Sequence, residues 1–264
     1  MQICWNSNLL KTTWEDRLRN ISKTVRDAEY EMVKRGLRKV DVFHMTPANF
    51  DKEIDKITRD GLIYLPIIRS RQYQGYSHQH YPVEQLDMNC MVYGVVAKDV
   101  GTAQEFIDAE KNRNYIKQGE LLGYPVCCSS RFSVLWQKEK ILDPCFEVAA
   151  ATKGATITDN TVTVAGHYYL NILLRYFGIK IIPFFPCSMD CAEAIKTGDK
   201  WIELFRDMNN QVADDLTFLL QLPLSWNLYK GYSYIETPLF RGVVNSYECP
   251  QKKIIWNVNG GKKE

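Results

Sequence analysis

Hydrophobic residues recur at intervals of three and four between Trp14 and Leu37. This interval matches one face of an α-helix, so the segment predicts a long amphipathic helix that packs on the body of the protein. Further along, Phe50, Ile54 and Ile57 mark a second helix on the same grounds. We expect that helix to stop at Gly61, because glycine readily adopts the left-handed conformation that ends helices.

Short runs of β-branched and aromatic residues predict strands in the first hundred positions. The runs are 40–45, 62–68 and 90–97, and the third predicts a central strand. Pro66 lacks the backbone N–H that an interior strand donates, so 62–68 is expected at an edge or at a strand end. The polar stretch 69–89 predicts a long loop.

The second half of the chain alternates between helical and extended patterns. Glycines and prolines divide these patterns into separate elements. In chain order we expect helices at about 102–113 and on to Leu122, an aromatic helix at 167–177, a buried strand at 179–185, a long helix from Ser188 towards Leu220 with an interruption near 197–199, and a hairpin or meander at 232–256.

Strands and helices interleave without a strict strand–helix–strand rhythm. This order favours an α+β fold with a mixed sheet and flanking helices over a doubly wound parallel sheet. No linker or repeat interrupts the 264 residues, so we expect a single domain over 1–264, with a frayed tail at about 258–264.

Composition narrows the range of functions. The formal net charge is +2, which indicates no electrostatic footprint for nucleic acid, so nucleic acid is not an expected partner. The chain shows neither a secretory signal pattern nor an apolar run of membrane-spanning length, which predicts a cytoplasmic location and no membrane partner. In a reducing compartment, eight cysteines point to metal binding or redox chemistry rather than to a disulfide scaffold.

Two of those cysteines lie in the segment GELLGYPVCCSSRF, at 119–132. Gly123 is the expected end of one helix, and Pro125 suits the first position of the next, where its missing N–H costs nothing. Cys127 and Cys128 then fall in the opening turn of that helix.

Two more lie in the segment IIPFFPCSMDCAEAI, at 181–195. Ser188 is the expected N-cap of the following helix. Cys187 lies just before this residue, and Cys191 lies in the predicted first turn. The sequence therefore places cysteine pairs at two helix N-termini.

Helix starts favour thiolates, because free N–H groups and the helix dipole stabilise negative charge there. We therefore predict that Cys127, Cys128, Cys187 and Cys191 converge on one metal or sulfur centre. Thiolates select iron–sulfur clusters, zinc or copper(I) over hard cations. Adjacent helical side chains diverge by about 100°, which favours an iron–sulfur cluster or an open three-thiolate site; zinc, copper(I) and iron are the alternatives.

The combination G-Y-P-x-C-C and P-C-S-x-x-C resembles the signature of a mostly archaeal protein family of unknown function. The similarity extends over about residues 90 to 195. It is specific at Gly123, Tyr124, Pro125, Cys127, Cys128, Pro186, Cys187, Ser188 and Cys191. The resemblance implies that both cysteine pairs belong to one shared site, and it implies no particular reaction.

Further residues suit roles around such a centre. Histidine titrates near neutral pH and serves as a base or a nitrogen ligand, and the arginine fork matches carboxylates and phosphates. The bland alternatives are hydrogen-bonded structural histidines and solvated arginines, and single cysteines such as Cys4, Cys90, Cys145 and Cys249 are expected to be inert core residues. The predicted catalytic residues are Cys128, His44 and His167, and the predicted cofactor- or substrate-binding residues are Arg69, Arg71 and Arg131.

The leading hypothesis is an enzyme of small-molecule or cofactor metabolism with a metal–thiolate centre, most simply an iron–sulfur cluster. Redox, sulfur-transfer and lyase or hydrolase reactions all suit such a centre, with a small-molecule substrate and an electron- or sulfur-donor protein as partners. One alternative is a structural zinc module. Another is a metal-free thiol or persulfide enzyme, in which one cysteine attacks and its neighbour resolves the intermediate.

Overall fold

The computed structural model describes residues 2–72, 80–83 and 90–258. Helices and two sheets, one mixed and one antiparallel, make up these residues, which confirms the α+β class. The chain divides into two compact units, and the division falls within helix α1 (Asn8–Lys34). Among the described residues, the first unit comprises 2–28 and 134–258, and the second comprises 29–72, 80–83 and 90–133. The organisation as a single domain stays a prediction.

The first unit is built on a seven-stranded sheet with the order β1-β10-β9-β8-β11-β7-β6. Strands β11 and β7 pair in parallel and the other neighbours pair antiparallel, so the sheet is mixed. Its strands are β1 (Gln2–Trp5), β6 (Thr156–Thr158), β7 (Thr161–Gly166), β8 (Leu224–Tyr229), β9 (Tyr232–Glu236), β10 (Phe240–Asn245) and β11 (Lys252–Val258). The antiparallel β9–β10 pair confirms the hairpin predicted at 232–256.

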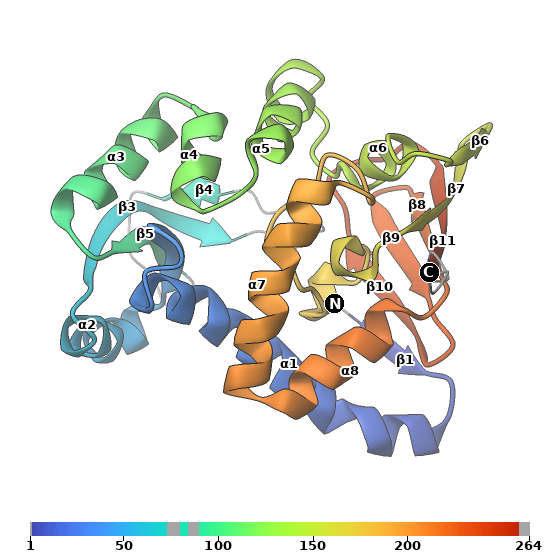
Figure 1. The fold of residues 1–264 in the computed structure, drawn as a ribbon, viewed down its shortest axis with the longest axis horizontal. Helices are drawn as coiled ribbons and strands as arrows, with labels where there is room; N and C mark the ends of the chain where they lie inside the picture. Colours follow the sequence, from blue (N-terminus) through green and yellow to red (C-terminus); the bar gives the residue numbers. More distant parts are fainter. Residues whose placement is uncertain (1, 73–79, 84–89, 259–264) are drawn as a thin grey trace. The chain divides into compact units, whose positions relative to one another are not determined.

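Alternating side chains build the core of this unit. Trp226, Phe240 and Trp256 are fully buried, while their neighbours along each strand turn outward. Helices α7 (Ala192–Met208) and α8 (Asn210–Leu220) pack on each other and on the 3₁₀ turn η3 (Tyr168–Leu170), as Figure 1 shows. Helix α6 (Cys145–Ala150) packs on β7 and β11.

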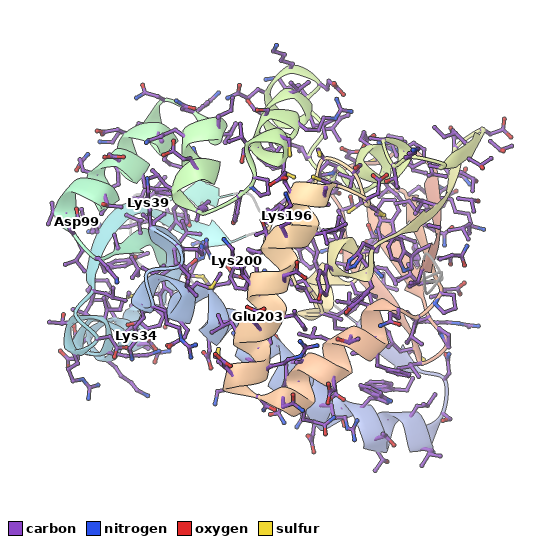
Figure 2. The ribbon with its side chains drawn as sticks, viewed as in Figure 1. Lys34, Lys39, Asp99, Lys196, Lys200 and Glu203 are labelled. Atoms are coloured by element: carbon purple, nitrogen blue, oxygen red, sulfur yellow. The ribbon has the colours of Figure 1, made fainter. Side chains whose placement is uncertain are left out.

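Helix α7 follows the amphipathic pattern that its sequence predicts. Trp201, Phe205 and their helical neighbours are buried. The opposite side carries exposed charges, among them Lys196, Lys200 and Glu203 (Figure 2). The polar side therefore faces solvent, and the apolar side contributes to the core of the unit.

The second unit is built on a four-stranded antiparallel sheet with the order β2-β5-β3-β4. The strands are β2 (Val40–Met45), β3 (Ile63–Gln72), β4 (His80–Pro82) and β5 (Met91–Ala97). The helical elements are η1 (Pro47–Asn49), α2 (Phe50–Arg59), α3 (Val100–Lys111), α4 (Tyr115–Leu121) and α5 (Val126–Ser133), and the π-helical turn η2 (Val134–Lys138) follows in the first unit. Strand β5 lies at the centre of the sheet, as predicted.

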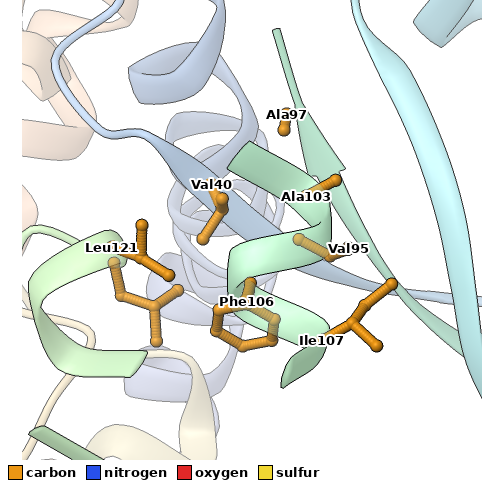
Figure 3. Close-up of a cluster of buried hydrophobic side chains, with 8 residues drawn as sticks. Val40, Val95, Ala97, Ala103, Phe106, Ile107 and Leu121 are labelled. Atoms are coloured by element: carbon orange, nitrogen blue, oxygen red, sulfur yellow. The ribbon is translucent and has the colours of Figure 1, made fainter. Parts of the chain in front are cut away.

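Helices cover both faces of this sheet, because successive strand residues point to opposite sides. On one face, Val95 and Ala97 belong to a core cluster with Phe106 of α3 and Leu121 of α4 (Figure 3). Val96, between them in sequence, packs on the other face with residues from α1 and α2. Asp99 begins α3 by accepting a hydrogen bond from the Thr102 N–H at 2.8 Å (Figure 2).

Most of the elements predicted in the first half of the chain are confirmed. Strand β2 has the expected bounds, α2 ends shortly before Gly61, and α1 starts earlier than its hydrophobic pattern. Strand β3 lies between β5 and β4, but β4 pairs only with Ser70–Gln72. At Pro66, beside a register shift, β3 pairs with β5 alone, so its other side is an edge that tolerates proline.

The loop predicted at 69–89 is wrong in part, because β3 continues to Gln72 and pairs with β4. Residues 73–79 and 84–89 of that stretch, and the tail from 259 on, lie outside the described residues.

The helix predicted at 167–177 is wrong. Two 3₁₀ turns, η3 and η4 (Arg175–Phe177), replace it. The Asn171 side chain donates to the Leu220 carbonyl at 3.0 Å and accepts from the Leu173 N–H at 3.2 Å. These bonds hold the Asn171 backbone in an extended conformation, which a continuous helix does not allow.

The strand predicted at 179–185 is also wrong. Ile179, Ile181 and Ile182 are buried, as a core strand requires, but the segment forms no strand in either sheet of the described chain. Pro183 and Pro186 have no N–H to donate to a ladder, so the segment crosses the core as irregular chain.

The long helix predicted from Ser188 starts later and breaks elsewhere. Helix α7 begins at Ala192, with Cys191 as its N-cap. The predicted interruption near Gly198 is absent, because Gly198 lies inside α7 against the ring of Tyr169. The break falls at Asn209, whose side chain accepts from the Val212 N–H and so caps α8.

Candidate metal centre

The four predicted cysteines lie together. The sulfur atoms of Cys127, Cys128, Cys187 and Cys191 are all within 4.8 Å of one another. The Sγ atoms of the adjacent Cys127 and Cys128 are 3.9 Å apart. Cys127 is exposed, Cys128 is buried, and Cys187 and Cys191 are intermediate. The prediction that two distant segments bring their thiols to one point is confirmed.

A tight turn places the first pair at the start of α5. Gly123 has a φ of 73°, a left-handed conformation that ends α4 at little steric cost. The Tyr124 N–H returns to the Gly119 carbonyl at 2.7 Å. Pro125 supplies the first helical carbonyl, which accepts from the Cys128 N–H at 3.0 Å. Both cysteines therefore occupy the first turn of α5, as the sequence predicted.

A buried arginine packs against Tyr124 of this turn. Arg38 is 5% exposed, and its guanidinium carbon lies 5.8 Å from the centre of the Tyr124 ring. One guanidinium nitrogen lies 3.4 Å from Asp41 and 3.8 Å from Glu29. Burial opposes the charge, but Asp41, Tyr124 and Glu29 outweigh it and raise the pKa of Arg38. No pattern in the sequence predicted this role, because Arg38 only follows the end of a helix.

Backbone hydrogen bonds hold the segment between Cys187 and Cys191. The Met189 N–H donates to the Thr152 hydroxyl at 2.9 Å. The Met189 carbonyl accepts from the His167 N–H at 2.8 Å. Met189 itself is fully buried. Protein groups from two other segments therefore fix the middle of the loop.

Asp190 fastens the same loop at a second point. Its carboxylate accepts from the Ser188 hydroxyl at 2.6 Å and from the Lys153 N–H at 3.3 Å. The expectation that Ser188 caps a helix is wrong, because its hydroxyl is committed to Asp190 and the helix starts after Cys191. Cys191 still lies at a helix N-terminus, one position before the first helical residue.

The two predicted histidines have structural surroundings. The Nδ1 atom of His167 accepts from the Tyr169 N–H at 3.3 Å, and burial lowers the pKa of His167, which favours the neutral ring. His44 lies in β2 with its ring 4.9 Å from that of Tyr93. In the part of the chain that the structure describes, the group of ligands within reach of one ion consists of the cysteines. Neither histidine belongs to it, and their catalytic role stays a prediction.

The three predicted arginines lie on regular elements. Arg69 and Arg71 are in β3 and share one side of the strand, because alternate residues point the same way. Arg131 is in the last turn of α5. Their role in gripping a cofactor or substrate stays a prediction.

The sulfur separations match a small coordination sphere. In tetrahedral zinc sites the zinc–sulfur bond is about 2.3 Å, which places the sulfur atoms about 3.8 Å apart. The 3.9 Å between Cys127 and Cys128 fits this edge, and all six pairs lie within 4.8 Å. The sulfur atoms of the adjacent cysteines therefore lie close together despite the divergence expected on a helix. The four thiols fit one metal ion.

The fold and the site define an α+β protein with a four-cysteine group able to hold a metal ion. No family model matches the chain, and no curated protein or solved structure matches it either. Among the described residues, no helix has the length and apolar character to cross a membrane.

Proposed function

We propose that this chain is a metal–thiolate enzyme whose centre is one soft metal ion held by Cys127, Cys128, Cys187 and Cys191. The observation that carries the proposal is the mutual approach of their sulfur atoms within 4.8 Å. Unrelated core cysteines have no reason to gather from two segments at two helix starts. The resemblance to the G-Y-P-x-C-C family supports the same shared site.

One ion is favoured over the iron–sulfur cluster that the sequence suggested. In a cluster, each cysteine binds a separate iron or shares one of two irons, so thiolates on different irons lie farther apart than the edge of one tetrahedron. Here the adjacent pair is 3.9 Å apart, the edge of one tetrahedron, and no pair exceeds 4.8 Å. Zinc and iron are the two metals that such thiolate sites commonly hold.

We propose that the metal centre has a catalytic role rather than a role in stabilising the fold. Structural zinc usually stabilises domains that are too small to bury a sufficient core. Here buried tryptophans, phenylalanines and aliphatic residues pack against both sheets and form a sufficient core. In addition, hydrogen bonds of Thr152, His167 and Asp190 hold the Cys187 loop without a metal. An exposed ligand, Cys127, leaves the centre accessible to a small molecule. Iron there supports one-electron redox chemistry, and zinc supports Lewis-acid or thiolate chemistry.

Anaerobic purification followed by metal analysis tests the proposal. We expect one zinc or iron per chain, retained by the Cys249→Ser control and lost in Cys187→Ser. Circular dichroism should show that both variants stay folded. A chain that remains metal-free after anaerobic reconstitution with zinc and with iron would refute the proposal. Several irons with labile sulfide would restore the cluster hypothesis.

The exposure of Cys127 also favours a second candidate, a metal-free thiol enzyme. Cys127 would attack the substrate, and Cys128, whose sulfur is 3.9 Å away, would resolve the intermediate. In that case Cys127→Ser abolishes reaction with a persulfide or disulfide substrate, while Cys187→Ser leaves the reaction intact. A metal centre predicts that both replacements act alike.

A further inference from the structure

Two segments of the first unit are joined by a group of acidic side chains that the proposed centre does not use. Glu248 accepts hydrogen bonds from the Leu142 and Asp143 N–H groups, at 2.9 and 3.2 Å. In return, Asp143 accepts from the Tyr247 N–H at 3.1 Å. Each segment therefore supplies a carboxylate that binds the backbone of the other.

A lysine completes the connection. The Lys252 ammonium lies 2.8 Å from Glu147 and 3.0 Å from Glu248, and all three side chains are less than one-fifth exposed. These bonds commit Lys252 to Glu147 and Glu248. The charge of Lys252 is therefore already balanced without Asp143.

Three buried polar atoms of this unit have no hydrogen-bond partner: Asp143 Oδ1, Glu147 Oε2 and Arg175 Nη1. Arg175 is close enough to Asp143 to act on its charge. Asp143 is fully buried. A buried acceptor and a buried donor that both lack partners are each costly, and pairing them would remove both penalties. Arg175, which acts electrostatically on Asp143, is thus a cation with an unused donor.

Arg175 is held in another arrangement. Its guanidinium carbon lies 4.1 Å from the centre of the Phe185 ring, within the range of a cation–π contact. Phe185 is buried and comes two residues before Cys187. The position of Arg175 therefore bears directly on the irregular chain that leads to the cysteine loop.

The charge of Asp143 changes near neutral pH. Burial raises the pKa of Asp143 to about 7, and the neighbouring Glu248 acts in the same direction. The Tyr247 N–H, Arg175 and Lys252 act against this rise. At lower pH the carboxyl is neutral and places little demand on Arg175, whereas at higher pH it is a buried anion.

We propose that Asp143 and Arg175 form a proton-controlled switch that acts on the segment leading to Cys187. With Asp143 protonated, Arg175 stays on the Phe185 ring and holds the segment in place. When Asp143 releases its proton to solvent, Arg175 turns to the free Asp143 oxygen and leaves Phe185. The charged groups that act on Asp143 are Glu248, Lys252 of β11 and Arg175 of η4. Lys252 is already bonded to Glu248 and to Glu147 of α6.

Hydrogen exchange of the full-length protein, read by mass spectrometry, tests the switch. The measurement follows the peptide that spans Phe184 to Met189 between pH 5.5 and 8.5, corrected for the intrinsic pH dependence of exchange. We expect protection to fall about fivefold, the equivalent of one cation–π contact, with a midpoint near pH 7. In Asp143→Asn the transition should disappear, and the peptide should stay protected at high pH.

Controls separate the switch from other pH effects. Asp214→Asn, which replaces an exposed carboxylate on α8, should keep the wild-type transition. A pH effect that arises from metal release at the cysteines would persist in Asp143→Asn, and that result would overturn the switch without touching the metal centre. If Asp143→Asn fails to fold, Arg175→Gln serves instead, and it should show low protection at every pH. A flat wild-type profile also overturns the proposal.

Discussion

The hydrogen bond between Thr152 and the Met189 N–H offers a direct test of how the cysteine loop is held. Thr152→Val keeps the shape of the side chain and removes the hydroxyl. Thr152 is 4% exposed and Met189 is fully buried, so water cannot replace the lost acceptor. The same hydroxyl donates to the Val148 carbonyl at 3.0 Å, and that bond is lost as well.

The expected cost follows from the unpaired N–H. Leaving a buried donor without a partner costs about 1–3 kcal/mol. The Val148 carbonyl also loses the hydroxyl that donates to it, which adds to this cost. We therefore expect the free energy of unfolding to fall by about 2 kcal/mol in Thr152→Val. Because the loop loses one of its fixed points, metal affinity should fall by about tenfold, the equivalent of 1.4 kcal/mol.

Urea unfolding followed by tryptophan fluorescence measures the first quantity, and competition with a chromophoric zinc chelator measures the second. Thr152→Ser is the matched control, because it keeps the hydroxyl and should remain close to wild type in both. Unchanged metal affinity in a clearly destabilised Thr152→Val would show that the loop does not need this bond to bind metal. Unchanged stability would refute the energetic reasoning itself.

Three further predictions concern acidity, packing and metal removal. The pKa of Asp143 is raised from 3.8 to about 7, so its contribution to stability is complete below about pH 4 and is lost as pH rises towards 7. Wild type should therefore lose up to about 4 kcal/mol of unfolding free energy between pH 4 and pH 8 that Asp143→Asn does not lose, as measured by urea titration at the two pH values. At Gly242 an added Cβ would overlap the tip of the Phe177 ring, so Gly242→Ala should lower the unfolding free energy by about 1–3 kcal/mol, and combining it with Phe177→Leu should recover part of the loss in the same assay. Removing the metal with a chelator should leave the circular dichroism spectrum intact and abolish activity or metal-dependent absorption; unfolding on chelation would instead favour the structural zinc module.

Local signals predicted much of the structure correctly. The period of α1, the β-branched run of β5 and the glycine after α4 each act through neighbouring residues, so a single sequence carries them. The same holds for the Pro-linked cysteines of α5, whose helix start depends on Gly123 and Pro125 alone. For this reason the first cysteine pair was predicted correctly at a helix start, whereas in the second pair only Cys191 lies at one.

The wrong predictions share a different cause. The segments 167–177 and 179–185 have helical and strand patterns, yet Asn171 bonds to Leu220, and prolines deny the second segment a ladder. Those partners lie far along the chain, and periodicity does not register them. The contact of Arg38 with Tyr124 and the buried position of Asp143 were not predicted for the same reason, because buried charges follow no regular spacing along the sequence.

The amino-acid sequence by itself determined the class of fold, most helix and strand positions, and the identity of the four cysteines. Tertiary structure decided that their sulfur atoms lie within 4.8 Å and that Thr152, His167 and Asp190 hold the loop between two of them. It also decided which acids and arginines are buried. Local preferences act over a few residues, whereas a coordination sphere and a buried charge depend on groups that only the folded chain brings together.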